Sequence, residues 1–230
     1  MSIKIVSSSR VESSKFITAE AAENQFPEYH IGFEKWLPFA SKELLISDNP
    51  KDYVLYPVPI MYSDLPNRNG VGFPLAELIK WNVKRGSQAY KAWTGMPMYE
   101  EHRSEDHRTA IGIVVDVALT QIKEYGNGKF WKIVALAALD RTKNPQLIAE
   151  VEEGKINTYS MGAMVDGWTC SYCGAEGGRC THIDPDKPVT FYELKGRLVY
   201  KMVYGVDPYE LSVVRDPAFA TAISDEKMVY

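Results

Sequence analysis

All three cysteines of this 230-residue chain lie within twelve positions of one histidine. The set is Cys170, Cys173, Cys180 and His182, with the spacing Cys-x2-Cys-x6-Cys-x-His. In a Cys-x2-Cys-Gly turn, backbone amides can point at the thiolate sulfurs, as structural zinc knuckles require. In an extended segment, side chains two positions apart project to the same side, so Cys180 and His182 can share one ion. The pattern predicts a structural zinc site.

A catalytic zinc is disfavoured, because four protein ligands leave no open position for water. Two other interpretations stay open. The three cysteines could be reduced thiols in a surface loop, or Cys170 or Cys173 could be a peptidase nucleophile that works with His102. The cysteine-peptidase interpretation is the weakest, since this spacing favours metal capture over a lone reactive thiol.

The overall composition excludes several classes. Hydrophobic residues make up 45% of the chain and charged residues 24%, which is ordinary for a globular protein. A net charge of −4 gives no general attraction to nucleic acid or to anionic membranes. The first ten residues lack the apolar core of a secretory signal, and no apolar run approaches the roughly 20 residues of a membrane span. We therefore expect a cytosolic protein that binds neither nucleic acid directly nor membrane.

Two strands give the clearest secondary-structure signal. Segments 110–121 and 129–139 are rich in Val, Ile and Ala and are joined across Gly126-Asn127-Gly128, whose residues tolerate positive φ. They are expected to be central strands of a closed or half-closed sheet. Further strands are expected at 53–61, 156–165, 197–203 and 209–214.

Two helices are expected. One spans 74–85, with Pro74 in its first turn and Gly86 closing its end; the other spans 145–153, with Asn144 as cap and Gly154 as terminator. The first thirty residues show no sustained strand pattern and are expected to be a mobile arm or to hold a short helix over 19–25. The order of elements predicts an α+β fold, with a β-rich, barrel-like core flanked by helices.

Ser160 stands out among the serines because of its setting. Side chains alternate along a strand, which places Thr158, Ser160 and Gly162 on one face, and the glycine leaves room there for a substrate backbone. A histidine can take a serine proton at neutral pH. His107 lies in a charged run typical of a solvated turn, so His102 is the better candidate for the base. The alternative for Ser160 is a serine in a tight strand crossing.

A third group must orient the imidazole and stabilise its charged form. Glu210 lies on a strand that is otherwise apolar, where a carboxylate needs a partner. That partner could be the histidine, or it could be a nearby Arg or Lys in a purely structural pair. Asp116 has the same unusual setting and is the reserve candidate.

Three short motifs resemble those of a known family. They are 98–102, Met-Tyr-Glu-Glu-His; 159–162, Tyr-Ser-Met-Gly; and 210–218, Glu-Leu-Ser-Val-Val-Arg-Asp-Pro-Ala. Their order and spacing over roughly 93–222 resemble the prohead maturation proteases of tailed bacteriophages, which are similar in turn to herpesvirus assemblins. The resemblance implies an assemblin-like fold with His102 as base and Ser160 as nucleophile. The third member is acidic in phage branches, which implies Glu210, and the oxyanion-stabilising backbone would lie near Arg215 and Asp216.

The resemblance also implies a function. Such a protein would be a serine endopeptidase that cleaves scaffold or core proteins, major capsid proteins and itself inside an immature prohead in the host cytoplasm, and it could form a homo-oligomer. The expected organisation is a mobile arm over 1–30, a protease domain over 31–222 that contains a zinc-knuckle insertion over 167–188, and a tail over 223–230. The alternative is a zinc-stabilised module that binds capsid or scaffold proteins without catalysis.

Overall fold

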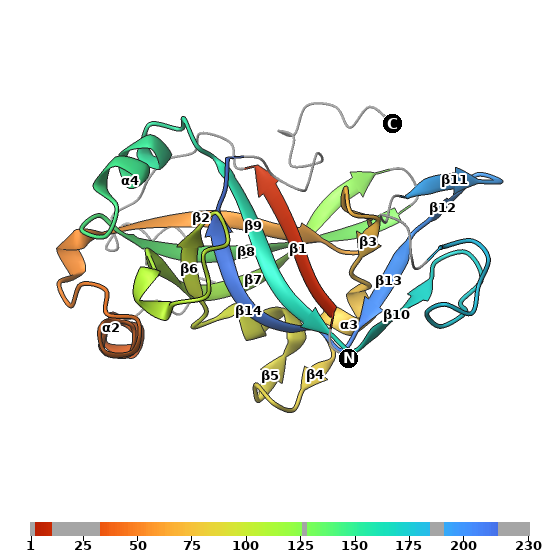
Figure 1. Cartoon of the computed structure of the whole chain (residues 1–230), viewed down its shortest axis with the longest axis horizontal. Helices are drawn as coiled ribbons and strands as arrows, with labels where there is room; N and C mark the ends of the chain where they lie inside the picture. Colours follow the sequence, from red (N-terminus) through yellow and green to blue (C-terminus); the bar gives the residue numbers. More distant parts are fainter. Residues whose placement is uncertain (1–2, 11–32, 126–127, 185–190, 216–230) are drawn as a thin grey trace.

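The structure is a computed structural model that describes residues 3–10, 33–125, 128–184 and 191–215. Within these residues, seven strands form a large sheet that curls into a half-barrel (Figure 1). The pair of β14 with β6 is parallel and the others are antiparallel. In spatial order the strands are β1 (Ile3–Arg10), β9 (Thr158–Val165), β14 (Asp207–Val213), β6 (Pro97–Glu100), β7 (Gly112–Tyr125), β8 (Gly128–Asp140) and β2 (Tyr53–Tyr62).

The hairpin of β7 and β8 confirms the predicted central strand pair. Residues of β8 alternate between two apolar cores: Ala135 and Ala137 face the core inside the curl, whereas Leu136 and Ala138 face a second core. Helix α2 (Phe33–Glu43) supplies Trp36 to that second core. A strand buried on both faces reads as a continuous apolar run, which is why this segment was recognisable in the sequence.

Helix α4 (Pro145–Glu152) confirms the second predicted helix and its end signals. The Asn144 side chain accepts a hydrogen bond from the Leu147 amide at 3.1 Å, as an N-cap does. Gly154 follows the helix with φ of 71°, a left-handed conformation that glycine adopts at little cost. The helix lies between β8 and β9, the strand that carries Ser160.

The prediction of a long helix over 74–85 is wrong. The structure has a four-residue helix, α3 (Leu75–Leu78), and then a small hairpin of β4 (Trp81–Asn82) and β5 (Ser87–Gln88). Apolar and polar residues alternate from Ile79 to Lys84, a period of two that suits strands. Asn82 accepts the Arg85 amide with its side chain, and Gly86, at φ of 63°, closes the hairpin turn and not a helix end.

A smaller sheet lies beside the large one. Within the described chain it holds three strands in the order β10 (Gly167–Cys170), β13 (Lys201–Tyr204) and β3 (Val71–Gly72). The single strand expected over 197–203 is divided at Tyr200, since 197–199 is β12, which pairs with β11 (Tyr192–Leu194). Short 3-10 turns complete the elements: η1 (Pro50–Asp52), η2 (Ala89–Trp93) and η3 (His107–Thr109).

The start of the chain differs from the expectation of an arm without strand structure. Residues 3–10 form β1, whose backbone pairs with β9 so that Ser8 lies opposite Ser160. The short helix expected over 19–25 and the tail over 223–230 lie outside the described residues. In the part of the chain that the structure describes, no helix has both the length and the apolar character to cross a membrane.

Candidate functional site

Neighbouring strands carry Ser160 and Glu210, and the chain after a third strand carries His102; within the described residues, no hydrogen bond joins His102 to Ser160. In the antiparallel pair of β9 and β14, Ser160 lies opposite Ser212, and Gly162 lies opposite Glu210. On the other side of β14, strand β6 runs parallel to it, with Glu100 at the level of Val213. The chain that leaves β6 therefore carries His102 directly to the edge of β14.

His102 and Glu210 are in direct contact. Nδ1 of His102 lies 2.9 Å from Oε1 of Glu210, although the two residues are 108 positions apart in the sequence. The Glu210 side chain is completely buried, whereas 26% of the His102 side chain is exposed. Burying a carboxylate costs much free energy unless the group is hydrogen-bonded. His102 provides such a hydrogen bond to the buried Glu210.

An unusual backbone turn orients His102. Glu101 and His102 have φ of 48° and 59°, two consecutive left-handed residues that are not glycine. Such residues are uncommon and need support from their surroundings. The Glu101 amide donates to the Val213 carbonyl at 2.9 Å, and the Ser104 amide donates to the His102 carbonyl at 2.8 Å. The turn thus continues the pairing with β14 and points the imidazole at Glu210.

The hydrogen bonds around Glu210 specify the form of the imidazole. The Ser212 hydroxyl donates to Oε2 of Glu210, so the carboxylate accepts on that oxygen. With Glu210 as an ionised carboxylate, which only accepts, the matching donor to Oε1 is Nδ1–H of His102. In neutral His102 the second ring nitrogen, Nε2, then has a free lone pair. This is the tautomer that a general base requires.

Ser160 lies on the same face of the sheet as Glu210 and Ser212. Its hydroxyl is buried and has no hydrogen-bond partner among the residues that the structure describes. The Tyr209 ring and the Glu210 carboxylate both pack over Gly162, because the register of β14 shifts between Pro208 and Glu210. Ser160 as a whole is only 2% exposed, so its hydroxyl is not open to solvent in this structure.

Other candidate residues lie elsewhere. Asp116, the reserve acid, is on β7 and forms an ion pair with Lys91, its Oδ1 lying 2.8 Å from Nζ. His107 belongs to the exposed turn η3. The Arg215 amide donates to Oε1 of Glu101 at 2.7 Å, and Asp216 lies outside the described residues.

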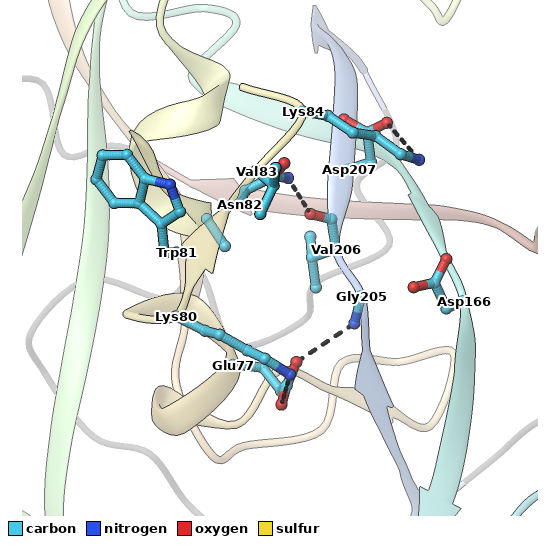
Figure 2. Close-up of a pocket in the computed structure, with 11 residues that line it drawn as sticks. Glu77, Lys80, Trp81, Asn82, Val83, Lys84, Asp166, Gly205, Val206 and Asp207 are labelled. Carbon is cyan, nitrogen blue, oxygen red and sulfur yellow. Dashed lines mark hydrogen bonds and ion pairs between the residues drawn. The ribbon is translucent and has the colours of Figure 1, made fainter. Parts of the chain in front are cut away.

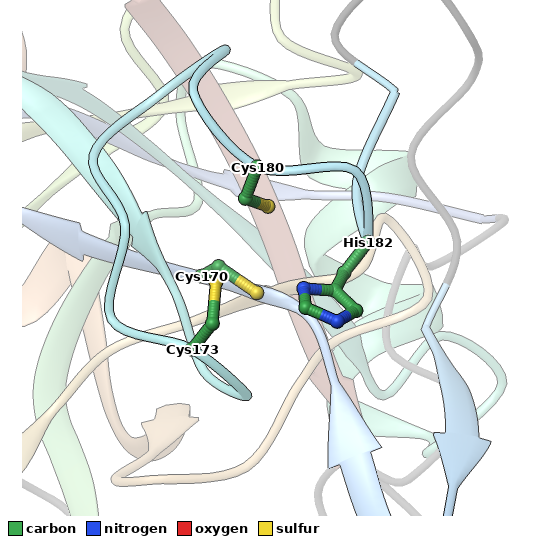
Figure 3. A group of neighbouring side chains, drawn as sticks. All are labelled: Cys170, Cys173, Cys180 and His182. Atoms are coloured by element: carbon green, nitrogen blue, oxygen red, sulfur yellow. The ribbon is translucent and has the colours of Figure 1, made fainter.

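The four metal-ligand candidates converge beyond the end of β10. Figure 3 shows the side chains of Cys170, Cys173, Cys180 and His182 directed toward a common space. One ligand atom from each lies within 4.8 Å of those from the others, so the group could hold a metal ion. Cys170 ends β10, and Cys173 follows in the next turn; Cys180 and His182 come from the loop after it.

The backbone around the cysteines has the form of two metal knuckles. Amides of Tyr172 and Cys173 are directed at the Cys170 sulfur, and amides of His182 and Ile183 at the Cys180 sulfur. Burial raises the pKa of the Cys170 thiol despite these amides. Burial also opposes ionisation of Cys180, yet the amides of Ile183 and His182 hold the pKa of that thiol below its ordinary value.

His182 is positioned for the same group. Its Nδ1 is buried without a hydrogen-bond partner in the described part of the chain, so that atom has a lone pair or a proton to spare. The Tyr172 ring packs on the His182 imidazole, with 4.7 Å between the ring centroids. The Arg197 guanidinium lies over the same Tyr172 ring, 5.0 Å from its centroid. The donor set and the free nitrogen fit a bound metal ion.

A pocket of about 260 Å³ lies apart from both groups, between the β4–β5 hairpin and the start of β14 (Figure 2). Two of the carboxylates that line it, Glu77 and Asp207, are engaged within the protein. Glu77 pairs with Lys80 at 3.3 Å and accepts the Gly205 amide, and Asp207 pairs with Arg85 at 2.8 Å. These contacts attach the hairpin to the start of the strand that carries Glu210.

Sequence comparison finds no known family model and no curated protein that match the chain. Among solved structures, the chain is similar to the capsid assembly protease gp21 of bacteriophage T4. The likeness covers 71% of this chain and 83% of that chain, at 15% identity and a TM-score of 0.37. Values this low carry no conclusion about function, which has to come from the geometry of the site.

Sequence reasoning missed two members of the site. Ser212 was not singled out, although its place two residues after Glu210 on a strand puts both side chains on one face. The packing of Tyr209 over Gly162 was also missed, because the alternation assumed for β14 takes no account of a bulge. The first could have been found from strand periodicity, whereas the second has no signal in the sequence.

Proposed function

We propose that this chain is a serine endopeptidase with Ser160 as nucleophile, His102 as general base and Glu210 as the carboxylate that orients the imidazole. One observation carries the proposal. His102 Nδ1 lies 2.9 Å from Oε1 of a completely buried Glu210, on the strand paired with the one that bears Ser160. A buried carboxylate that holds a partly exposed imidazole in its basic tautomer is the arrangement that activates a serine hydroxyl.

The reaction would follow the usual course of acyl transfer. Nε2 of His102 takes the proton of the Ser160 hydroxyl while Oγ attacks the peptide carbonyl carbon, and the imidazolium then protonates the leaving amine. Water, activated by the same nitrogen, hydrolyses the acyl-enzyme and releases Ser160. Glu210 stays ionised throughout, because its role is to hold Nδ1–H and to stabilise the imidazolium.

Stabilisation of the oxyanion is assigned to the backbone near Arg215 and Asp216, as the sequence resemblance implies. Backbone amides that point at the developing charge lower the barrier without having to reorganise. The Arg215 amide now donates to Oε1 of Glu101, at 2.7 Å. For this amide to take part in catalysis, the Glu101 carboxylate has to give way.

The proposed substrates are scaffold or core proteins and major capsid proteins of a phage, together with the protease itself. The support is the order and spacing of the three motifs that resemble prohead maturation proteases, which include His102, Ser160 and Glu210. Cleavage would take place inside the immature prohead in the host cytoplasm.

The metal group is proposed to bind one structural zinc ion. Three thiolates and an imidazole are a donor set that zinc prefers, and two pairs of backbone amides support Cys170 and Cys180. The ion would add folding stability by tying the loop that follows β10 to the end of that strand. With four protein ligands it would have no place in the chemical step.

Labelling with a fluorophosphonate tests the proposal. The probe should form an adduct on Ser160 in the wild-type protein, and none in Ser160→Ala or in His102→Ala, where the hydroxyl has no base. Co-expression with a scaffold protein then shows whether the shortened product depends on the same residues. If the folded, zinc-loaded wild-type protein takes up no probe and leaves scaffold intact, the chain is instead a non-catalytic, zinc-stabilised binding module.

A further inference from the structure

Ser212 also places a hydroxyl on the face of the sheet that carries Ser160. The two serines lie directly opposite each other in the pairing of β9 with β14. Ser212 is completely buried, and its parallel neighbour on β6 is Tyr99. A buried hydroxyl in the centre of a sheet needs a hydrogen bond to offset the loss of water. The partner that this one has is the proposed catalytic carboxylate.

Ser212 and His102 hold the two oxygens of Glu210 separately. The Ser212 hydroxyl donates to Oε2 at 2.5 Å, and His102 Nδ1 lies 2.9 Å from Oε1. With both oxygens engaged, the plane of the carboxylate is fixed. Gly162, which faces Glu210 across the strands, has no side chain to restrain the carboxylate on that side. The Ser212 hydroxyl holds Oε2, which leaves Oε1 directed at the imidazole.

Ser212 is poorly suited to be a nucleophile itself. Its proton is already donated to a carboxylate, and the base nitrogen of His102 is the one on the far side of the ring from that carboxylate. Ser160, by contrast, has a hydroxyl without a partner among the described residues. Ser160 and Ser212 thus differ, since the Ser212 hydroxyl is bound to the acid and the Ser160 hydroxyl has no partner in the described chain.

We propose that Ser212 is a positioning residue of the triad, which acts through Glu210 to fix the orientation and tautomer of His102. The proposal rests on the proposed function. It adds a residue whose loss would leave Ser160, His102 and Glu210 all present but poorly aligned. Removing one neutral donor from a charged acceptor is expected to lower the reaction rate roughly 10- to 100-fold.

The test measures the rate at which a fluorophosphonate labels Ser160. Ser212→Ala should label roughly 10- to 100-fold more slowly than wild type. Ser212→Cys fills the same space with a weak donor and should be slowed similarly, whereas Ser212→Thr keeps the hydroxyl and should recover most of the rate. Ser63→Ala is the matched control: Ser63 is also completely buried, but its hydroxyl accepts the Trp131 amide away from the site.

Two further readouts separate positioning from a merely structural role. In ¹⁵N-histidine-labelled protein, the Nδ1–H proton signal of His102 should shift in Ser212→Ala and not in Ser63→Ala. In a Glu210→Gln background, Ser212→Ala should add little to the loss, because the residue through which it acts is already altered. Full additivity of the two losses would overturn the proposal.

The outcomes distinguish this proposal from the proposed function. If Ser160→Ala is still labelled, and mass spectrometry maps the adduct to Ser212, both the nucleophile and the positioning role are wrong. If only Ser160 takes the probe, while Ser212→Ala and Ser212→Cys label at the wild-type rate with an unshifted His102 signal, the peptidase proposal stands and the role of Ser212 is overturned.

Discussion

Gly162 lies directly opposite Glu210, and a Cβ atom on Gly162 would come within 2.4 Å of Glu210 Oε1. The same atom would meet the Tyr209 ring, also at 2.4 Å. These distances are too short for any real contact, so the carboxylate and the ring can occupy their positions only because residue 162 has no side chain. The glycine therefore makes room for the acid and the Tyr209 ring, and not for a substrate backbone as its place in the sequence suggested.

Gly162→Ala should therefore disable the site while the sheet still forms. The methyl group has to push Oε1 away from His102, and overpacking of this kind typically costs about 1–3 kcal/mol of stability. Gly112→Ala is a control for overpacking without contact to Glu210, since its Cβ would meet the Ala138 carbonyl oxygen at 2.2 Å in the β7–β8 pair. Calorimetry and fluorophosphonate labelling of both variants separate the two effects. If Gly162→Ala and Gly112→Ala are equally stable and are labelled at the same rate, the absence of a side chain at Gly162 is not what positions Glu210.

Ser160→Ala should abolish labelling and processing without loss of stability. Its hydroxyl is buried and has no partner in the described chain, so removal of the oxygen relieves an unsatisfied polar group. We expect a melting temperature equal to or slightly above that of wild type, and loss of activity by several orders of magnitude. A marked fall in melting temperature would show that the hydroxyl is a structural member of the sheet.

Glu210→Gln should lower activity strongly, whereas Asp116→Asn should have little effect on it. Glu210→Gln keeps the shape of the side chain but fails to stabilise the imidazolium, and a comparable change in a known triad lowers turnover about 10⁴-fold. Asp116→Asn weakens a partly exposed ion pair with Lys91, which is worth about 1 kcal/mol or less. Steady-state cleavage and thermal melting of both proteins check the expectation. If Asp116→Asn is inactive while Glu210→Gln stays active, the carboxylate that orients His102 is Asp116 on β7.

The purified protein should contain about one zinc ion per chain, as elemental analysis would measure. A chelator should lower the melting temperature, because binding energy in a structural zinc site contributes to folding. Cys173→Ser should bind less zinc and should melt at nearly the same temperature with and without chelator. A metal-free protein of full stability would show that the four residues form an ordinary loop.

Local signals in the sequence predicted the local parts of the fold. The β7–β8 pair and α4 were found because their apolar runs and the cap residue Asn144 act within a few positions. The prediction of a helix over 74–85 was wrong. Pro74 and Gly86 suit the two ends of a helix, but the alternating residues between them suit the hairpin that forms. Turn signals alone do not decide which element lies between them.

The site was predictable as a set of residues and not as an arrangement. The sequence indicated His102, Ser160 and Glu210 as types suited to the chemistry, but it left Asp116 open as the acid. The choice depends on the parallel pairing of β6 with β14, which joins segments more than a hundred residues apart, and no local pattern encodes that pairing. Ser212 joins the candidate site for the same reason, through its place in the sheet.

Only Asp166 separates β9 from β10, so Ser160 and the first zinc ligand candidate lie on one nearly continuous ribbon of chain. A shift of β9 by a single residue against β14 would turn Tyr159 or Met161 toward the site and Ser160 away from it. A metal ion at Cys170 would act as a fixed end point that opposes such slippage. Changes in length between Gly174 and Arg179 should thus be tolerated in evolution far better than one residue gained or lost between Ser160 and Cys170.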